Sequence, residues 1–398
     1  MRITFFFLYI CSGLVFSISA QTAFTKGVIH DSIPVLGAAN ESFALYLPER
    51  YQENELSSIV FIFDPGARAA IGIGSFIEVS EKYGHILVCS NNSRNGPYER
   101  NFDIANNLFN HIFSNFTVKE DEMYISGFSG GSRLASAIAS LTNKFAGVIG
   151  CGAGFSNIKE HMPSTQNYAY VGLCGDRDMN YRELLENKDY LNLIKFNSTL
   201  ITYDGDHSWP PPEQISRAFD WLRLQKLKKS PPEASKEILG LYKSDYDRIG
   251  PFKEAGALLY ASEQYERILK SYSPMVSVDS LAKQYQELLT SADYKKRLAS
   301  HTNVLKMERK LAGKLRAQIT SDFKNPGETD FGWWEKELNK LNTLKKRKGV
   351  EVDKMVYRIK FDLFVRAYSR KNAPLYSSNE EQAALVDRFL DMLYPRKE

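Results

Sequence analysis

Short, continuous apolar runs mark the first part of the chain. They lie at 58–63, 85–89, 122–126, 145–150, 168–173 and 199–203, after a segment at 27–48 that suits two strands. Stretches with helical periodicity lie between them, at 75–83, 102–116, 132–143 and 213–228. Short apolar runs without alternation are typical of strands buried on both faces, as in a parallel sheet. Their alternation with helices predicts an α/β fold, in which ligands bind at the carboxyl ends of the strands.

The pattern changes after a Ser-Pro-Pro-Glu segment at 230–233. From there on the strand signal disappears, and long helical patterns follow at 253–272, 279–290, 294–323, 333–346, 352–369 and 380–393. We therefore predict an α/β domain over 21–229 and an all-α C-terminal domain over 230–398. Residues 255–269 resemble a tetratricopeptide repeat, but no second copy lies in phase with them. A tetratricopeptide-like arrangement is thus one option for these helices.

Residues 1–20 have the pattern of a secretory signal peptide. Arg2 precedes an apolar core at 3–16, and the small residue Ala20 stands at the expected cleavage point. A membrane anchor needs about 20 apolar residues, more than this segment offers. A lipoprotein site at Cys11 is disfavoured because Ile10 is larger than such sites accept. We expect an exported protein, periplasmic or secreted, that does not span a membrane.

Composition and charge exclude some partners. At 398 residues the chain is long enough for two domains with sizeable cores, and its net charge of +4 is too small to indicate nucleic-acid binding. Cleavage after Ala20 leaves Cys89, Cys151 and Cys174, each near the end of a predicted strand. Buried free cysteines are the favoured interpretation, although a Cys151–Cys174 bridge stays open if their strands are neighbours.

The sequence Gly-Phe-Ser-Gly-Gly at 127–131 stands between a β-prone run and a helical stretch. In this context a G-x-S-x-G pattern predicts a nucleophile elbow, where glycines allow a sharp strand-to-helix turn. The turn lifts the oxygen of Ser129 above the sheet, next to the N–H groups of a helix N-terminus. An ordinary glycine-rich turn is the alternative. An acid and a histidine in the correct downstream order would favour the elbow.

The histidine is found by elimination among the six histidines of the chain. Four histidines precede the candidate acid, and His301 lies in a charged helical segment. His207 directly follows the predicted strand at 199–203, in a glycine-containing loop. The acid is expected after the strand at 168–173, where Asp178 lies three residues beyond Gly175. Asp176, the other carboxylate of this loop, is expected to form the turn.

These residue types suit nucleophilic catalysis. Ser129 is expected to be the nucleophile, His207 the general base and Asp178 the residue that orients the imidazole. The N–H of Gly130 is expected to stabilise the oxyanion. A second donor should come from the loop that follows the strand at 58–63. We expect it to be the N–H of Ala67, with Arg68 as the alternative.

Between about residues 40 and 225 the chain resembles the α/β-hydrolase superfamily. Within it, the chain is similar to the secreted polyhydroxybutyrate-depolymerase and feruloyl-esterase-like branch. The resemblance is carried by the elbow at 127–131, by Gly-Asp-Arg-Asp at 175–178 and by His-Ser-Trp-Pro at 207–210. It implies an α/β-hydrolase fold and cleavage of a carboxylic ester, often on a carbohydrate or polymer fragment. One departure is Pro65-Gly66 where the branch has His-Gly. The helical part lies outside the resemblance.

Three further side chains are candidates for substrate binding. Asn92 and Arg94 follow the strand at 85–89, and they either hold sugar hydroxyls or a carboxylate or form a hydrogen-bonded loop. Trp209 is either a pocket wall or a packing residue. We expect no metal and no cofactor, since no cluster has metal-ligand spacing and no phosphate or dinucleotide loop occurs.

The sequence therefore predicts an exported serine esterase. One alternative is a non-catalytic binding or scaffold protein, in which the hydrolase part is idle and the helical part recognises a protein or glycan partner. Acyl transfer instead of hydrolysis is a third option, because the same three residues serve it when water is excluded.

Overall fold

The computed structural model describes residues 24–53, 55–229, 235–273, 275–347, 349–371 and 379–395. The predicted signal peptide and the 230–233 segment lie outside these ranges. Within them, no helix combines the length and the apolar character needed to cross a bilayer.

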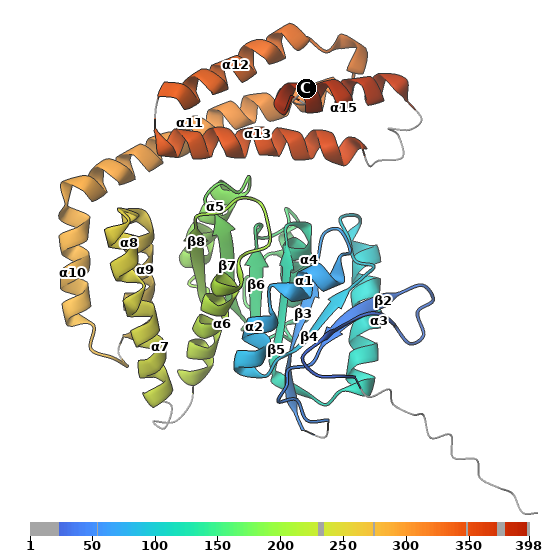
Figure 1. Ribbon diagram of the computed structural model, residues 1–398, viewed down its shortest axis with the longest axis vertical. Helices are drawn as coiled ribbons and strands as arrows, with labels where there is room; N and C mark the ends of the chain where they lie inside the picture. The colour runs from blue at the N-terminus through green and yellow to red at the C-terminus, as the bar shows by residue number, and fades with distance from the viewer. Residues whose placement is uncertain are drawn as a thin grey trace, which may run out of the picture.

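In the described residues an eight-stranded sheet forms the centre of the first part, with the strand order β1-β2-β4-β3-β5-β6-β7-β8 (Figure 1). The strands are β1 (Ile29–Pro34), β2 (Ser42–Tyr46), β3 (Ser57–Phe63), β4 (Ile86–Ser90), β5 (Val118–Phe128), β6 (Gly147–Cys151), β7 (Ala169–Gly175) and β8 (Ser198–Tyr203). Strand β2 pairs antiparallel with β1 and β4, and the other pairs are parallel. The apolar runs are thus buried parallel strands. The predicted α/β-hydrolase fold is confirmed.

Helices cover both faces of the sheet. One face packs against α3 (Tyr98–Asn115) and α4 (Gly130–Thr142). The other packs against α1 (Ala69–Gly74), α2 (Ile77–Tyr83) and α6 (Pro212–Leu227). Neighbouring strand residues alternate between the two cores: Phe61 belongs to the first and Ile62 to the second. The sheet is therefore shielded on both sides and presents its functional groups only at its ends.

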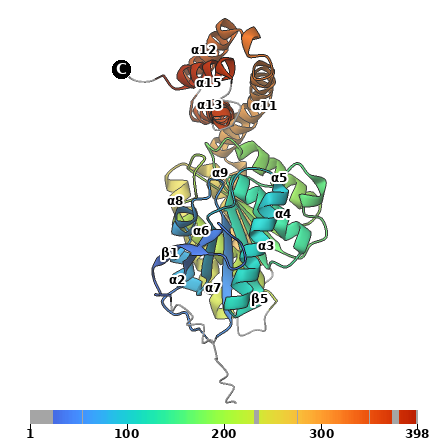
Figure 2. The same cartoon turned by 90° about the vertical axis from the view of Figure 1, so that its right-hand side faces the viewer.

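The rest of the described chain is helical: α7 (Ser235–Asp247), α8 (Ile249–Glu254), α9 (Leu258–Tyr272), α10 (Asp279–Thr290), α11 (Ala292–Asp322), α12 (Phe331–Arg347), α13 (Val350–Lys371) and α15 (Glu380–Leu393). The predicted helix at 253–272 is in fact two helices, because Gly256 between them has φ +65°. Helices α7 to α10 pack beside α6 through a shared apolar core. Helices α11, α12, α13 and α15 form a bundle with a core of its own around Trp334. Both views show this bundle lying across one end of the sheet (Figures 1 and 2).

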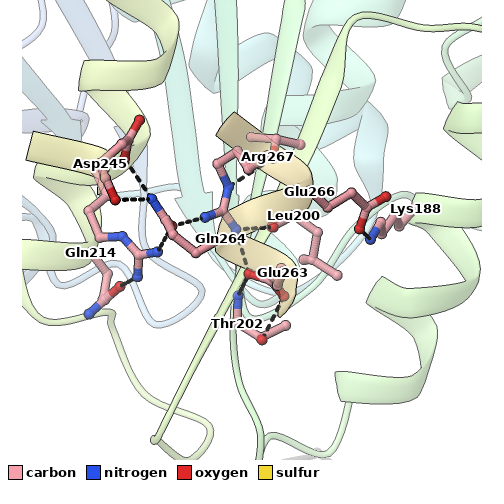
Figure 3. Close-up of polar contacts among 11 residues, drawn as sticks. Lys188, Leu200, Thr202, Gln214, Asp245, Glu263, Gln264, Glu266 and Arg267 are labelled. Atoms are coloured by element: carbon pink, nitrogen blue, oxygen red, sulfur yellow. Dashed lines mark hydrogen bonds and ion pairs between the residues drawn. The ribbon is translucent and has the colours of Figure 1, made fainter. Parts of the chain in front are cut away.

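Helix α9 closes the open edge of the sheet at β8 (Figure 3). The carboxylate of Glu263 accepts hydrogen bonds from the N–H and the hydroxyl of Thr202, at 2.9 and 2.7 Å. Arg267 donates to the carbonyl oxygen of Leu200 at 2.8 Å. These side chains bond to an N–H and a carbonyl oxygen that a further strand would pair with, so α9 covers this part of the edge.

The three described cysteines are free and buried. Strands β6 and β7 are neighbours, but Cys151 is in register with Leu173 and not with Cys174. The favoured interpretation of isolated buried thiols is confirmed, and the Cys151–Cys174 bridge is not formed.

Candidate active site

The segment 127–131 forms a tight turn between β5 and α4. Ser129 has φ 53° and ψ −118°, a strained conformation for a residue with a side chain. Its N–H donates to the carbonyl oxygen of Cys151 at 2.8 Å. A Cβ atom added to Gly127 would lie 2.3 Å from the backbone of Gly131, and one added to Gly131 would lie 2.0 Å from the carbonyl oxygen of Phe63. Only glycines let the strand and the helix approach this closely.

The structure brings Ser129, His207 and Asp178 into one hydrogen-bonded row. His207 Nε2 lies 3.0 Å from Ser129 Oγ, and its Nδ1 lies 2.8 Å from Asp178 Oδ2. The side chains of His207 and Asp178 are 8% and 1% exposed. In this arrangement the imidazole contacts the serine through one nitrogen and the carboxylate through the other, as a serine nucleophile requires.

Two loops position the acid and the histidine against each other. The N–H of Asp176 donates to the carbonyl oxygen of Tyr203 at 2.9 Å, and that of Arg177 donates to Gly205 at 2.8 Å. The loops after β7 and β8 therefore continue the pairing of their strands. A Cβ atom on Gly175 would lie 2.4 Å from the backbone of Gly205, so the close approach depends on glycine.

The Asp178 carboxylate is held at both oxygens. Its Oδ1 accepts the N–H of Asn180 at 2.7 Å while Oδ2 faces His207. Burial raises the pKa of Asp178 above its ordinary value, and the hydrogen bond with His207 opposes that shift. The buried carboxylate thus depends on its hydrogen bonds to remain ionised.

The N–H groups expected to supply the second oxyanion donor lie in the loop after β3 and are bonded to Asp64. The N–H of Gly66 donates to Asp64 Oδ1 at 2.8 Å, that of Ala67 to the Asp64 carbonyl oxygen at 3.2 Å, and that of Arg68 to Oδ1 at 3.3 Å. Ala67 does not line the cavity at Ser129 either, whereas Gly130 does. Asp64 draws the N–H groups of its own loop towards itself, so both donors considered for this loop, Ala67 and Arg68, are already bonded.

Asp64 is a buried carboxylate beside Ser129 whose contacts could not be read from the sequence. It is fully buried, and its carboxylate pairs with Arg68 through two hydrogen bonds of 3.0 Å. Its Oδ2 also accepts the indole N–H of Trp209 at 2.9 Å. Trp209 packs against Phe76 and Phe128 and does not line the cavity. The indole is therefore a packing residue that ties the loop of His207 to the loop after β3, and it is not a pocket wall.

The other two candidate binding residues, Asn92 and Arg94, lie in different surroundings. Asn92 accepts the N–H of Ser42 and donates to the carbonyl oxygen of Asn40, both at 2.8 Å. Both ends of its carboxamide are thus used to hold the turn between β1 and β2, and Asn92 does not reach the cavity. Arg94 does line it.

A cavity of about 440 Å³ lies at Ser129. From the first part of the chain it is lined by polar side chains that include Ser93, Arg94, Asn95, Asn101, Arg133 and Asn180. From α13 it is lined by Asp362, Val365, Arg366 and Ser369. Their spacing of three and four residues places these four on one face of the helix. One wall of the site is therefore built by the helical part, which carries no motif that points to a site.

Helix α13 is fixed to the loops of the acid and the histidine. Lys354 Nζ lies 2.7 Å from Asp176 Oδ2, which also accepts the hydroxyl of Tyr260. Tyr357 donates to Asp206 at 3.3 Å, and the ring of Phe361 lies 5.8 Å from that of His207. Asp176 is therefore more than the turn former that the sequence suggested, since its carboxylate pairs with the helical part.

Within the described residues, no group of three or more His, Cys, Asp and Glu side chains is placed to hold a metal ion. The polar groups at the site are hydroxyl, imidazole, carboxylate, amide and guanidinium groups, beside the apolar side chains of Leu134, Met179 and Val365.

No family model and no curated protein sequence matches the chain. Several solved structures have a similar fold. S-formylglutathione hydrolase (FrmB) from Staphylococcus aureus is 18% identical, with 50% of this chain and 98% of that chain covered and a TM-score of 0.42. FphF, a fluorophosphonate-binding serine hydrolase from the same organism, is 17% identical over 49% and 97%, with a TM-score of 0.39. Est1E from Butyrivibrio proteoclasticus is 11% identical over 50% and 99%, with a TM-score of 0.38.

Proposed function

We propose that the protein is a serine hydrolase that cleaves a carboxylic ester through Ser129, His207 and Asp178. The observation that carries this proposal is the row Ser129–His207–Asp178, with contacts of 3.0 and 2.8 Å at a serine of positive φ. Structural turns do not need a serine in a strained conformation with its hydroxyl facing an imidazole. Strain of this kind is found at functional sites.

The chemistry follows from these contacts. Ser129 Oγ attacks the ester carbonyl carbon while His207 Nε2 takes its proton, and Asp178 stabilises the resulting imidazolium. The N–H of Gly130 stabilises the oxyanion. Collapse of the tetrahedral intermediate breaks the bond to the alcohol, which receives the proton from His207. A water molecule, deprotonated by His207, then attacks the carbonyl carbon of the acyl-enzyme. The acid is released, and Ser129 regains its proton from His207.

The size and polarity of the cavity support a small polar substrate. Its volume of about 440 Å³ falls at the lower end of small-molecule sites. Amide and guanidinium groups line it together with the apolar side chains of Pro65, Leu134, Met179 and Val365. An ester on a carbohydrate or a polymer fragment suits these groups better than a long acyl chain does.

We further propose that the chain is exported and cleaved after Ala20, with a hydrolase domain over 21–229 and a helical domain over 230–398. The separate apolar core of the bundle around Trp334 supports a helical unit that begins at α11, whereas α7 to α10 share an apolar core with α6 across residue 230. N-terminal sequencing of the protein recovered from its native host tests the cleavage: a first residue of Gln21 supports it, and an intact Met1 contradicts it.

Hydrolysis of p-nitrophenyl acetate and butyrate by the chain without residues 1–20 tests the activity. We expect turnover in the wild type, and a loss of about 10³-fold or more in kcat for Ser129→Ala, with an unchanged circular dichroism spectrum. A fluorophosphonate probe should label Ser129 in the wild type and not in the variant. Absence of both turnover and labelling in the wild type would refute the proposal.

The bonded donors of residues 66–68 favour a second candidate, a binding protein with an idle hydrolase part. A site with one oxyanion donor stabilises its transition state less than a site with two. In that case the helical part would recognise a protein or glycan partner. The experiment above separates the two, because an idle site gives neither turnover nor labelling.

A further inference from the structure

The charges that line the cavity at Ser129 do not cancel. Arg133 forms two hydrogen bonds with Glu183, at 2.6 and 2.8 Å, and Asp64 is matched by Arg68. These two pairs are neutral. Arg94 and the group around Asp362 remain, and both lie on the cavity wall.

Arg94 has a fixed backbone and a free side chain. Its carbonyl oxygen accepts from Asn101 at 2.9 Å and from Arg100 at 3.2 Å, and its strand-like bridge to Gly66 holds it from the other side. Within the part of the chain that the structure describes, its guanidinium has no hydrogen-bond or ion-pair partner. An exposed guanidinium without a counter-charge, on a loop whose backbone is fixed, is suited to binding an anion.

Arg366 provides a second cation from α13. Asp362 is shared by two arginines, with Arg316 Nε at 2.8 Å and Arg366 Nε at 3.1 Å. This group of three therefore carries one net positive charge. Arg366 uses Nε for this contact, and among the described residues its two terminal nitrogens have no partner. These two nitrogens can donate hydrogen bonds to both oxygens of a carboxylate.

We propose that the substrate is an ester bearing a second, negatively charged group, a carboxylate, that binds between Arg94 and Arg366. This inference rests on the proposed function and names the substrate class. Arg94 comes from the loop after β4 and Arg366 from α13, so the anion bridges the two parts of the molecule. The helical part thus contributes to substrate selection.

Paired substrates test the proposal. The mono-p-nitrophenyl ester of adipic acid carries a free carboxylate, and its counterpart with that carboxyl methylated is neutral. We expect the wild-type kcat/KM to be about tenfold higher for the anionic ester, as a charge-assisted hydrogen bond provides. Arg94→Gln and Arg366→Gln should each lower this ratio, mainly through KM. Arg309→Gln, on the surface of α11 with a 70% exposed side chain, is the charge-matched control and should leave it unchanged.

A binding measurement keeps this inference separate from the proposed function. Monomethyl adipate, titrated into Ser129→Ala by calorimetry, should bind, and Arg94→Gln in that background should weaken it about tenfold. If the wild type hydrolyses both esters with a ratio of kcat/KM values, anionic to neutral, near one, the inference is overturned and the proposed esterase activity stands. If the wild type hydrolyses no ester but monomethyl adipate binds in a way that depends on Arg94, the anion site is supported and the proposed esterase activity is refuted. No binding and no preference overturn the site.

A different observation assigns the second oxyanion donor. The N–H groups of residues 66–68 are bonded to Asp64, whereas the carboxamide of Asn95 has no hydrogen-bond partner among the described residues. This carboxamide lies against Gly130: a Cβ atom there would be 1.7 Å from Asn95 Oδ1. A half-turn of the amide places Nδ2 in that position. We infer that Asn95 Nδ2 donates to the oxyanion beside the N–H of Gly130.

Three variants test this role. Asn95→Ala should lower kcat for p-nitrophenyl acetate about 10²-fold with little change in KM, as loss of one oxyanion donor does. Asn95→Asp keeps the shape but presents only acceptors, so its kcat should fall at least as far. Asn110→Ala, on the exposed side of α3, is the control. Retention of wild-type kcat by both Asn95 variants overturns the assignment, and absence of turnover and labelling in the wild type overturns it together with the enzyme.

Discussion

The guanidinium of Arg358 donates a hydrogen bond to the backbone carbonyl oxygen of Asp176 at 2.6 Å. Asp176 precedes Asp178 by two residues, so a helix 182 positions further along the chain is bonded to the loop that holds the acid. Arg358 is 1% exposed, pairs with Glu308 and lies 5.1 Å from the ring centre of Tyr181. The helical part is thereby connected to the proposed catalytic row through buried polar contacts.

Replacing Arg358 should disturb both parts. In Arg358→Met the carboxylate of Glu308 is left buried without its partner, and the free energy of unfolding should fall by about 3 kcal/mol. The acid loop also loses its bond to α13, so kcat should fall as well. Urea unfolding and ester turnover measure the two effects. Arg309→Gln, which removes an exposed pair with Glu186, should change stability by less than about 1 kcal/mol. Equal effects of both substitutions would contradict the assigned role of Arg358.

The two adjacent glycines of the elbow should respond differently to alanine. In Gly131→Ala the new Cβ would lie 2.0 Å from the backbone oxygen of Phe63, which cannot move away without displacing β3. We expect a loss of about 3 kcal/mol or more, or no folded protein. In Gly130→Ala the new Cβ meets the end of the Asn95 side chain, which can rotate. This variant should fold, and thermal unfolding of both proteins distinguishes the cases.

Stability should fall in mild acid because of His85. Burial, with smaller contributions from the positive charges of Arg50, Arg223 and Lys119, lowers the pKa of His85 to about 3. Its Nδ1 lies 2.6 Å from the hydroxyl of Ser58. The unfolded chain takes up a proton below pH about 6.5, while the folded protein does not until pH about 3. Between these values the free energy of unfolding should decrease by about 1.4 kcal/mol per pH unit. Unfolding of the wild type and of His85→Gln at pH 7 and 5 measures this, and equal slopes would disprove it.

Removing Glu263 should expose the edge of the sheet. In Glu263→Ala the N–H of Thr202 loses its acceptor and Arg267 loses an ion pair. We expect a loss of about 2 kcal/mol and a greater tendency to associate through β8. Light scattering after mild heating measures the association. Glu266→Ala, which breaks only an exposed pair with Lys188, is the matched control and should stay monodisperse.

The sequence predicts the sheet and the elbow well because their signals are local. Buried parallel strands appear as apolar runs, and the glycines at 127 and 131 are needed by contacts within one turn. The order of serine, acid and histidine along the chain follows from the fold. These features can be recognised one segment at a time.

The walls of the cavity could not be predicted in this way. Asn92 and Asn95 are three residues apart in one polar loop, yet one holds a turn and the other faces Gly130. Which amide faces the site depends on neighbours from β1, β2 and α4, and not on the loop itself. Arg366 is a still clearer case, because an arginine on a long charged helix carries no local sign that it lines a cavity at a serine far away in the sequence.

The bundle of α11, α12, α13 and α15 has its own apolar core, with Trp334 fully buried and its indole N–H 2.7 Å from Asp322. A unit with a separate core can open below the temperature at which the sheet melts. Since this unit carries Arg366 and the contacts to Asp176, its opening would leave the sheet intact but change the chemistry at Ser129. Under the proposed function, heat sensitivity and substrate choice are linked through one group of helices. A substitution near Trp334 should then alter which esters a warmed sample accepts without changing Ser129.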